Sequence, residues 1–282
     1  MKKTVPILVV ISFLLVIVIL ILCLVSTFRK EEPTEVTIME VPTYEATSYE
    51  YAYMYNFLNE DAKTVYRQLY SGIHNNEKHI DLEPLLSDEE FEKVFGLLIA
   101  QEPQFYNVCG VMEYTVLIRN SKVNSINIEY LHESTEIIDK CITEVREEVV
   151  QECSEMTSRE KVKYIHDYLI NRVDYSETGE DIDNLTGVFY NKAATCSGYA
   201  KAFQYLCEQV GVQGVIVTGE ANGNHMWNMV NINDEWLALD CTWDDPDCND
   251  KGVIYYDYFL VDINRMEQSH KMDDYYKMIL EV

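Results

Sequence analysis

Residues 194–211 read ATCSGYAKAFQYLCEQVG, and they are followed by HMWNMV at 225–230 and WLALDCTWDDP at 236–246. The first segment repeats apolar residues at helical spacing and ends in a glycine, so it predicts a helix whose first turn contains Cys196. The unpaired amides and the dipole at a helix N-terminus favour the thiolate form of a cysteine. Cys207 lies on the apolar stripe of the same helix, and we expect it to be buried and unreactive.

The two later segments predict a β-hairpin. The strands expected are His225–Ile232 and Glu235–Asp240, joined by an Asn-Asp turn and preceded by a buried strand at Val215–Thr218. Side chains alternate along a strand, so a turn of even length leaves His225 and Asp240 on the same face, whereas an odd turn or a bulge separates them. The spacing therefore permits a hydrogen bond between this histidine and this aspartate.

A thiol at a helix start, with a histidine and an acid on adjacent strands, favours a Cys-His-Asp triad. In this hypothesis Cys196 is the nucleophile, and His225 acts first as a base and then as an acid. Asp240 orients the imidazole and stabilises its cation. Thr195 or Ser197 can cap the helix, which is the structural interpretation of the polar residues around the cysteine.

These motifs resemble those of the transglutaminase-like superfamily of papain-like thiol enzymes. In that family the cysteine of C-x-G-Y/F, the histidine before Trp-Asn and the aspartate of D-x-T-W form the triad, and they match Cys196, His225 and Asp240. KVKYIHDYLINRVDY is similar to the helix before the cysteine and YYDYFLVD to the strand after D-x-T-W, so the resemblance spans residues 157–265. Met226 replaces a frequent alanine and Cys241 a usual aliphatic residue, and neither change removes a catalytic group.

The resemblance implies an α+β fold in which the cysteine-bearing helix packs on an antiparallel sheet. It also implies acyl transfer through a thioester on Cys196, without a cofactor or a metal. The acceptor can be water, as in a peptidase or amidase, or an amine, as in a cross-linking enzyme, and hydrolysis is slightly favoured. Similar members are exported or surface proteins of Gram-positive bacteria, so we expect a protein or peptide substrate at the cell surface or cell wall. The alternative is an inert binding or scaffolding module.

For further site residues the sequence leaves alternatives open. The resemblance implies that the oxyanion is bound by the Cys196 amide and one side chain, for which Tyr190 and Asn191 are both candidates. Trp227 and Trp243 either line the substrate groove or pack in the core.

Two other features have a structural and a functional interpretation. His166 lies on an apolar stripe, which favours a core histidine over a catalytic one. The acidic run that includes Asp244 and Asp245 lacks EF-hand spacing, so a solvated turn is favoured over a calcium site.

Upstream of this core, the sequence predicts a smaller α+β region. Asn59 can cap one helix, and capping-box spacing occurs at Ser87 and again at Thr157. Alternation around an Asn-Ser turn predicts a hairpin of 111–119 and 122–131, and a long helix is expected over 134–156. The domains predicted are an anchor at 1–30, an acidic linker at 31–48, an α+β region at 49–132 and a catalytic domain at 133–282.

The N-terminus predicts a membrane anchor. Val5–Val25 contains no charged residue, and 21 residues in a helix span about 30 Å, which is the thickness of a hydrocarbon core. This run exceeds the apolar part of a cleavable signal peptide and lacks a small-x-small cleavage site. Lys2 and Lys3 precede it, so we expect a single uncleaved signal anchor with residues 31–282 outside the cytoplasm.

Charge excludes one class of partner. The chain has 282 residues and a net charge of −26, and the first thirty residues contain four of its 22 basic residues and none of its 48 acidic ones. The exported part then carries a net charge of −30, which repels phosphate backbones, so nucleic acid is not expected as a partner. One of the eight cysteines lies in the anchor, and the odd number that remains indicates at least one free thiol.

Overall fold

A computed structural model of the chain describes residues 52–108, 114–119, 122–131, 135–245 and 253–282. The predicted anchor at 5–25 and linker at 31–48 lie outside these residues. Within the described ranges, no helix combines the length and the apolar character needed to span a membrane. The described residues belong to one compact unit.

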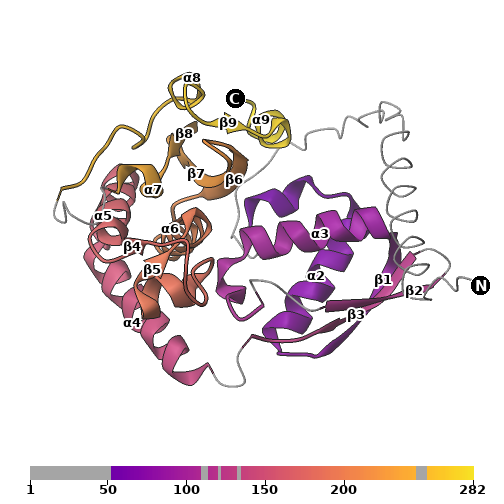
Figure 1. The fold of residues 1–282 in the computed structure, drawn as a ribbon. Helices are drawn as coiled ribbons and strands as arrows, with labels where there is room; N and C mark the ends of the chain where they lie inside the picture. The colour runs from indigo at the N-terminus through magenta and orange to yellow at the C-terminus, as the bar shows by residue number, and fades with distance from the viewer. Residues whose placement is uncertain (1–51, 109–113, 120–121, 132–134, 246–252) are drawn as a thin grey trace, which may run out of the picture. The chain divides into compact units, whose positions relative to one another are not determined.

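The described elements are helices and three small sheets, of which the β4-β5 pair is parallel and the other two are antiparallel (Figure 1). The helices, including 3-10 and π turns, are η1 (Tyr53–Phe57), α2 (Glu60–His74), α3 (Asp88–Gln101), η2 (Pro103–Phe105), α4 (Glu136–Glu152), α5 (Ser158–Ile170), η3 (Thr186–Asn191), α6 (Cys196–Gln209), α7 (Cys241–Asp244), α8 (Ile263–Met266) and α9 (Asp274–Leu280). The strands are β1 (His79–Ser87), β2 (Tyr114–Arg119), β3 (Lys122–Ile128), β4 (Asp174–Tyr175), β5 (Ala193–Ala194), β6 (Gly214–Glu220), β7 (Asn224–Ile232), β8 (Glu235–Leu239) and β9 (Lys271–Met272).

The C-terminal part is built on a four-stranded antiparallel sheet in the order β8-β7-β6-β9. The turn between β7 and β8 consists of Asn233 and Asp234, whose φ angles of 56° and 65° match the left-handed conformation that two-residue hairpin turns require. Asn228 pairs with Leu239 and Ile232 with Glu235, so the hairpin has no bulge along its length. The predicted hairpin and its even turn are confirmed.

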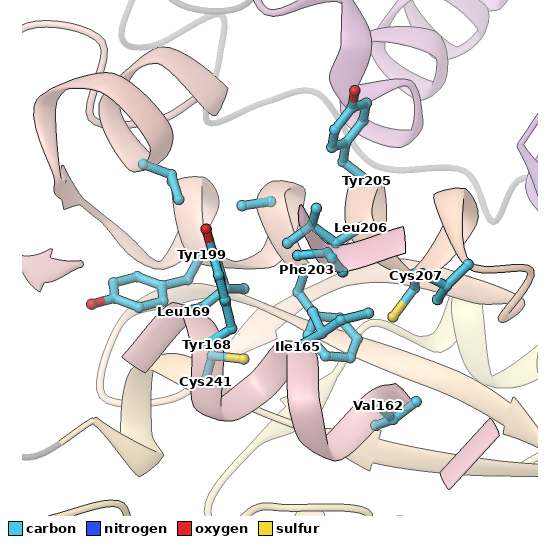
Figure 2. Close-up of a cluster of buried hydrophobic side chains, with 14 of the residues drawn as sticks. Val162, Ile165, Tyr168, Leu169, Tyr199, Phe203, Tyr205, Leu206, Cys207 and Cys241 are labelled. Carbon is cyan, nitrogen blue, oxygen red and sulfur yellow. The ribbon is translucent and has the colours of Figure 1, made fainter. Parts of the chain in front are cut away.

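Helix α6 is the central helix of this part, and ten of its fourteen residues, from Gly198 to Cys207, are buried. Its Tyr199, Phe203 and Leu206 pack against Val162 and Ile165 of α5 in one apolar cluster (Figure 2). Cys207 and Cys241 lie in the same cluster, and both are less than a tenth exposed. The core therefore holds the start of α6 in a fixed position relative to the sheet.

The upstream α+β region has its own sheet and its own core. Its strand order is β1-β3-β2, and α2 and α3 bury their apolar faces in a separate cluster with β1 and β3. The side chain of Asn59 caps α2, and complete capping boxes begin α3 at Ser87 and α5 at Thr157, as predicted. The buried Gln101 side chain connects this region to β6, because it donates to the Ile216 carbonyl at 2.7 Å and accepts from the Ile216 amide at 3.2 Å.

Three predictions about local structure need correction, and one strand was missed. Strand β1 was not predicted, and the helix expected over 134–156 spans only Glu136–Glu152. YYDYFLVD is not a regular strand, although Val261 forms a single bridge with Ala238. Neither Thr195 nor Ser197 caps α6, because both hydroxyls bond to the 182–183 segment instead.

Candidate active site

Cys196 is the first residue of α6, and its side chain is partly exposed. The Thr195 hydroxyl donates to the Asp183 carboxylate at 2.6 Å, and the Ser197 hydroxyl donates to the Asp183 carbonyl at 3.3 Å. The first turn of α6 therefore has no side-chain cap. Its unpaired amide groups and the positive end of the helix dipole lie next to the Cys196 thiol. Gly198 allows this packing, because a Cβ there would overlap the backbone of Ile182.

His225 is the second residue of β7, and it points toward Asp240, the residue that follows β8. The distance from His225 Nε2 to Asp240 Oδ2 is 2.7 Å. The register explains this contact: Asn228 pairs with Leu239, so position 227 is opposite Asp240, and His225 lies on the same face as 227. The Cys196 thiol lines the same groove as His225, and its interaction with the imidazole helps to raise the pKa of that ring. Because Nε2 is used by Asp240, Nδ1 is the nitrogen left for the thiol.

Asp240 is buried, with an exposed fraction of 1 %, and both of its carboxylate oxygens accept hydrogen bonds. Oδ1 accepts from the amides of Thr242 at 2.8 Å and Trp243 at 3.3 Å, because Asp240 is the N-cap of the short helix α7. Oδ2 accepts from His225 and also from His270 Nε2, at 3.0 Å. Four donors thus compensate the burial of this carboxylate.

The charges of the three groups support one another. Burial lowers the pKa of His225, but hydrogen bonds and charge interactions with Asp240 and Cys196 outweigh it and raise the pKa to about 9. Burial raises the pKa of Asp240, but the hydrogen bonds from His225 and His270 hold it below its usual value. The arrangement therefore favours an imidazolium at neutral pH, paired with a carboxylate on one side and with the sulfur on the other.

A groove of about 580 Å³ opens at Cys196 and His225. Its described lining also contains four carboxylate residues and no lysine or arginine: Glu177, Asp183, Glu220 and Asp273. Tyr175 of β4 lines the groove as well, and its phenol donates to Glu177 at 3.2 Å. The nucleophile is therefore reached through a negatively charged opening.

The other predicted site residues lie elsewhere. Tyr190 is exposed, and the Asn191 amide donates to the Glu180 carbonyl at 3.1 Å, so neither candidate oxyanion donor lines the groove. Lys192 has a φ of 62°, and this left-handed residue turns the chain between η3 and β5. Trp227 is buried in the core, its ring 6.0 Å from that of His225, and it does not line the groove either.

Trp243 is partly buried, and its ring centroid lies 6.0 Å from that of His225. It packs beside the triad and is not among the groove residues. Sequence reasoning missed two residues of the site, Tyr175 and His270. A Tyr in a two-residue strand and a His in the run Ser-His-Lys carry no motif, so no local signal could have identified them.

Three of these side chains have atoms of the types that bind metals. His225, Asp240 and His270 gather two ring nitrogens and a carboxylate within 4.8 Å of one another. Both nitrogens, however, face the same oxygen at 2.7 and 3.0 Å, which are hydrogen-bond distances. Protons on the two nitrogens account for this geometry, and the groups act as donors and acceptor.

A second buried histidine is structural. His166 is fully buried between Asp167, at 3.0 Å, and Asp244, at 3.2 Å, which confirms it as a core histidine. The interpretation of Asp244 as part of a solvated turn is wrong, because it is fully buried and also accepts from the Tyr258 amide. Asp245 is partly buried and accepts from the Tyr199 hydroxyl at 2.5 Å, and the acids at 247 and 250 lie outside the described residues.

The other described cysteines differ from Cys196 in their surroundings. Burial raises the pKa of the Cys153 thiol, and it raises those of Cys207 and Cys241 strongly. Cys141 is partly buried, and its thiol donates to the Phe189 carbonyl at 3.1 Å. Positions 109 and 248 lie outside the described residues.

Part of the chain matches a known family. Residues 143–241, which include Cys196, His225 and Asp240, match the family model of the transglutaminase-like superfamily. Over this segment, which is about a third of the chain, the resemblance drawn from the motifs is confirmed. The match supports an α+β core of the thiol-enzyme type.

Individual relatives are distant. The chain is 28 % identical over 102 residues to kyphoscoliosis peptidase of Mus musculus, and 26 % identical over 105 residues to the Homo sapiens protein. The mouse alignment covers 30 % of this chain and 15 % of the relative, so the chain spans less than a fifth of that protein.

Solved structures give partial likenesses. One is a transglutaminase, with 14 % identity and a TM-score of 0.35, covering 46 % of this chain and 44 % of the other. Another is the periplasmic domain of TgpA from Pseudomonas aeruginosa, with 18 % identity and a TM-score of 0.30, covering 36 % and 42 %.

Proposed function

We propose that this protein is a thiol enzyme that transfers or hydrolyses acyl groups of peptides or amides through Cys196, His225 and Asp240. The observation that carries the proposal is the hydrogen bond between His225 and the buried Asp240, in a groove that also contains the partly exposed thiol of Cys196. The groove at the thiol gives a substrate access to it.

The reaction has two halves. The thiolate sulfur of Cys196 attacks the carbonyl carbon, and the amide at the start of α6 donates to the oxyanion. When the C–N bond breaks, His225 gives its proton to the leaving amine and a thioester remains on Cys196. Water or an amine then loses a proton to His225 and attacks the thioester, which releases an acid or a new amide and restores the Cys196 thiolate beside the imidazolium.

The acceptor decides between a peptidase or amidase and a cross-linking enzyme, and we favour hydrolysis. The groove is open to solvent, so water can reach a thioester on Cys196. Incubation with a peptide library and a fluorescent primary amine distinguishes the two. Cleaved peptides without incorporated amine support hydrolysis, whereas incorporation at glutamine side chains contradicts it.

The enzyme itself is tested by the reactivity of its thiols. An iodoacetamide probe should label Cys196 much faster than any other cysteine, and His225→Ala should abolish the difference. His166→Asn is a matched control, because His166 is also buried and paired with an aspartate but lies outside the groove. Slow, uniform labelling of all cysteines would support the alternative, an inert binding or scaffolding module.

Location is part of the proposal. We infer a single-pass membrane protein with residues 31–282 outside the cytoplasm, which acts on proteins or peptides at the cell surface. The uncharged run at 5–25 and the two lysines before it support this topology. Carbonate should fail to extract the full-length protein, and protease added to intact cells should remove a C-terminal tag. A mature N-terminus near Ser26 would contradict it.

A further inference from the structure

His270 is a second histidine on the triad's carboxylate. It comes 30 positions after Asp240 and immediately before β9, and its side chain is fully buried. The pairing of β9 with β6 places it, because Met272 is opposite Gly219 and Lys271 opposite Glu220. A side chain at Gly219 would overlap the Lys271 backbone, so the glycine lets this short strand approach.

The two imidazoles share a single oxygen. Asp240 Oδ2 accepts from His225 Nε2 at 2.7 Å and from His270 Nε2 at 3.0 Å. Oδ1 cannot relieve this sharing, because it already accepts the amides of Thr242 and Trp243. Each donor on Oδ2 draws on the same negative charge, so the bond from His270 weakens the interaction between Oδ2 and His225.

The surroundings of His270 fix its orientation. Nε2 faces a carboxylate and must carry a proton, and Nδ1 lies 2.9 Å from the Ser269 hydroxyl, which can donate to it. The rings of Trp227, Trp243 and Tyr258 surround the imidazole, with centroids 5.1, 4.5 and 5.0 Å away. The titratable groups that face it are therefore Asp240, His225 and the Tyr258 phenol.

We propose that His270 is a positioning residue of the triad, which takes part of the charge on Asp240 Oδ2 and so limits how firmly that carboxylate holds the proton of His225. This inference rests on the proposed function. A histidine cation that is held too firmly is a poor acid toward a leaving amine, because proton transfer is most efficient when the acid's pKa is near the working pH. His270 thereby favours release of the proton in the first half of the reaction.

Alkylation of Cys196 by iodoacetate tests this without a known substrate. The reagent is an anion and is attracted to the imidazolium, so its rate should fall as His225 loses its proton, near pH 9 in the wild type. In full-length His270→Leu, which has no donor, the fall should move to higher pH by about half a unit or more. His270→Gln places an amide N–H near the position of Nε2 and should keep the wild-type profile.

The outcomes separate this inference from the proposed function. No fast alkylation in the wild type would contradict the proposed function. Fast alkylation with an unmoved or lowered profile in His270→Leu would overturn the role of His270 alone. If His270→Leu does not fold, His270→Asn replaces it, because its amide is too short to reach Oδ2.

A measurement on the wild type is independent of the variants. ¹⁵N NMR of the histidines should show a proton on His270 Nε2 in the state in which His225 carries both protons. The absence of a proton from His270 Nε2 in that state would overturn the inference.

Discussion

Replacing Asp240 with asparagine tests the triad with a minimal change in shape. The oxygen of the new side-chain amide can keep the backbone amides of Thr242 and Trp243, and its nitrogen then occupies the position of Oδ2. That nitrogen donates and faces two ring nitrogens that also donate. His225 must move its proton to Nδ1 to accept a bond, which is the wrong tautomer for a base that faces Cys196.

The size of the effect follows from His225. Its pKa is raised from 6.5 to about 9. That difference corresponds to about 3 kcal/mol of stabilisation of the imidazolium, which Asp240 and Cys196 share. A return of the pKa from about 9 to 6.5 lowers the fraction of imidazolium at pH 7 only about fourfold, so most of the expected effect comes from the wrong tautomer. We therefore expect acylation to slow by about 10²- to 10⁴-fold.

The assay is the burst of p-nitrophenol that accompanies acetylation of the thiol by p-nitrophenyl acetate. Stopped-flow rates are compared for the wild type, Asp240→Asn and Asp183→Asn. The last is the matched control, because Asp183 is a groove carboxylate that bonds to Thr195 and not to His225. A burst in Asp240→Asn within about threefold of the wild type, with an unchanged pH profile, would refute the orienting role.

Three further predictions concern pH, packing and charge. Because the pKa of His225 is raised in the folded protein, the contribution of this residue to stability should be complete below pH 6.5 and be lost as the pH rises through about 9. Urea unfolding across this range should show the decline in stability, and His225→Gln should flatten it. Gln101→Leu removes the side-chain partners of the Ile216 amide and carbonyl. Thermal denaturation should therefore show a loss of about 2–4 kcal/mol of stability. An unchanged melting temperature would show that this side chain does not join the upstream region to β6. Glu220→Gln should reduce kcat/KM for lysine-containing peptides about two- to fivefold more than for neutral peptides, and high salt should remove this difference. Equal effects on both kinds of peptide would mean that the charge of the groove does not select basic substrates.

The parts of the fold that local chemistry determines could be predicted from sequence. The capping boxes at Ser87 and Thr157 need only four consecutive residues each, and both formed as expected. The shared face of His225 and Asp240 followed from the parity of one turn, since no bulge interrupts β7 and β8. These features depend on residues that are close in the chain. The helix that begins at Cys196 was predictable in the same way, because the spacing of apolar residues within it is a local pattern.

The features that could not be predicted depend on distant contacts. His270 reaches Asp240 through a two-residue strand that only the backbone of β6 holds in place. Tyr190 was a reasonable candidate by proximity to Cys196, but the left-handed Lys192 turns the chain between them. Asp244 looked solvated in an acidic run, and its burial follows from its pairing with His166, 78 positions earlier.

The most direct test of the account is to trap the acyl-enzyme. After a brief reaction with p-nitrophenyl acetate and an acid quench, mass spectrometry should find one acetyl group on the Cys196 peptide of the wild type. It should be absent from Cys196→Ala and strongly reduced in His225→Ala. An acetyl group on another cysteine, or equal acetylation of Cys196 in the wild type and His225→Ala, would contradict the central claim that His225 activates this thiol.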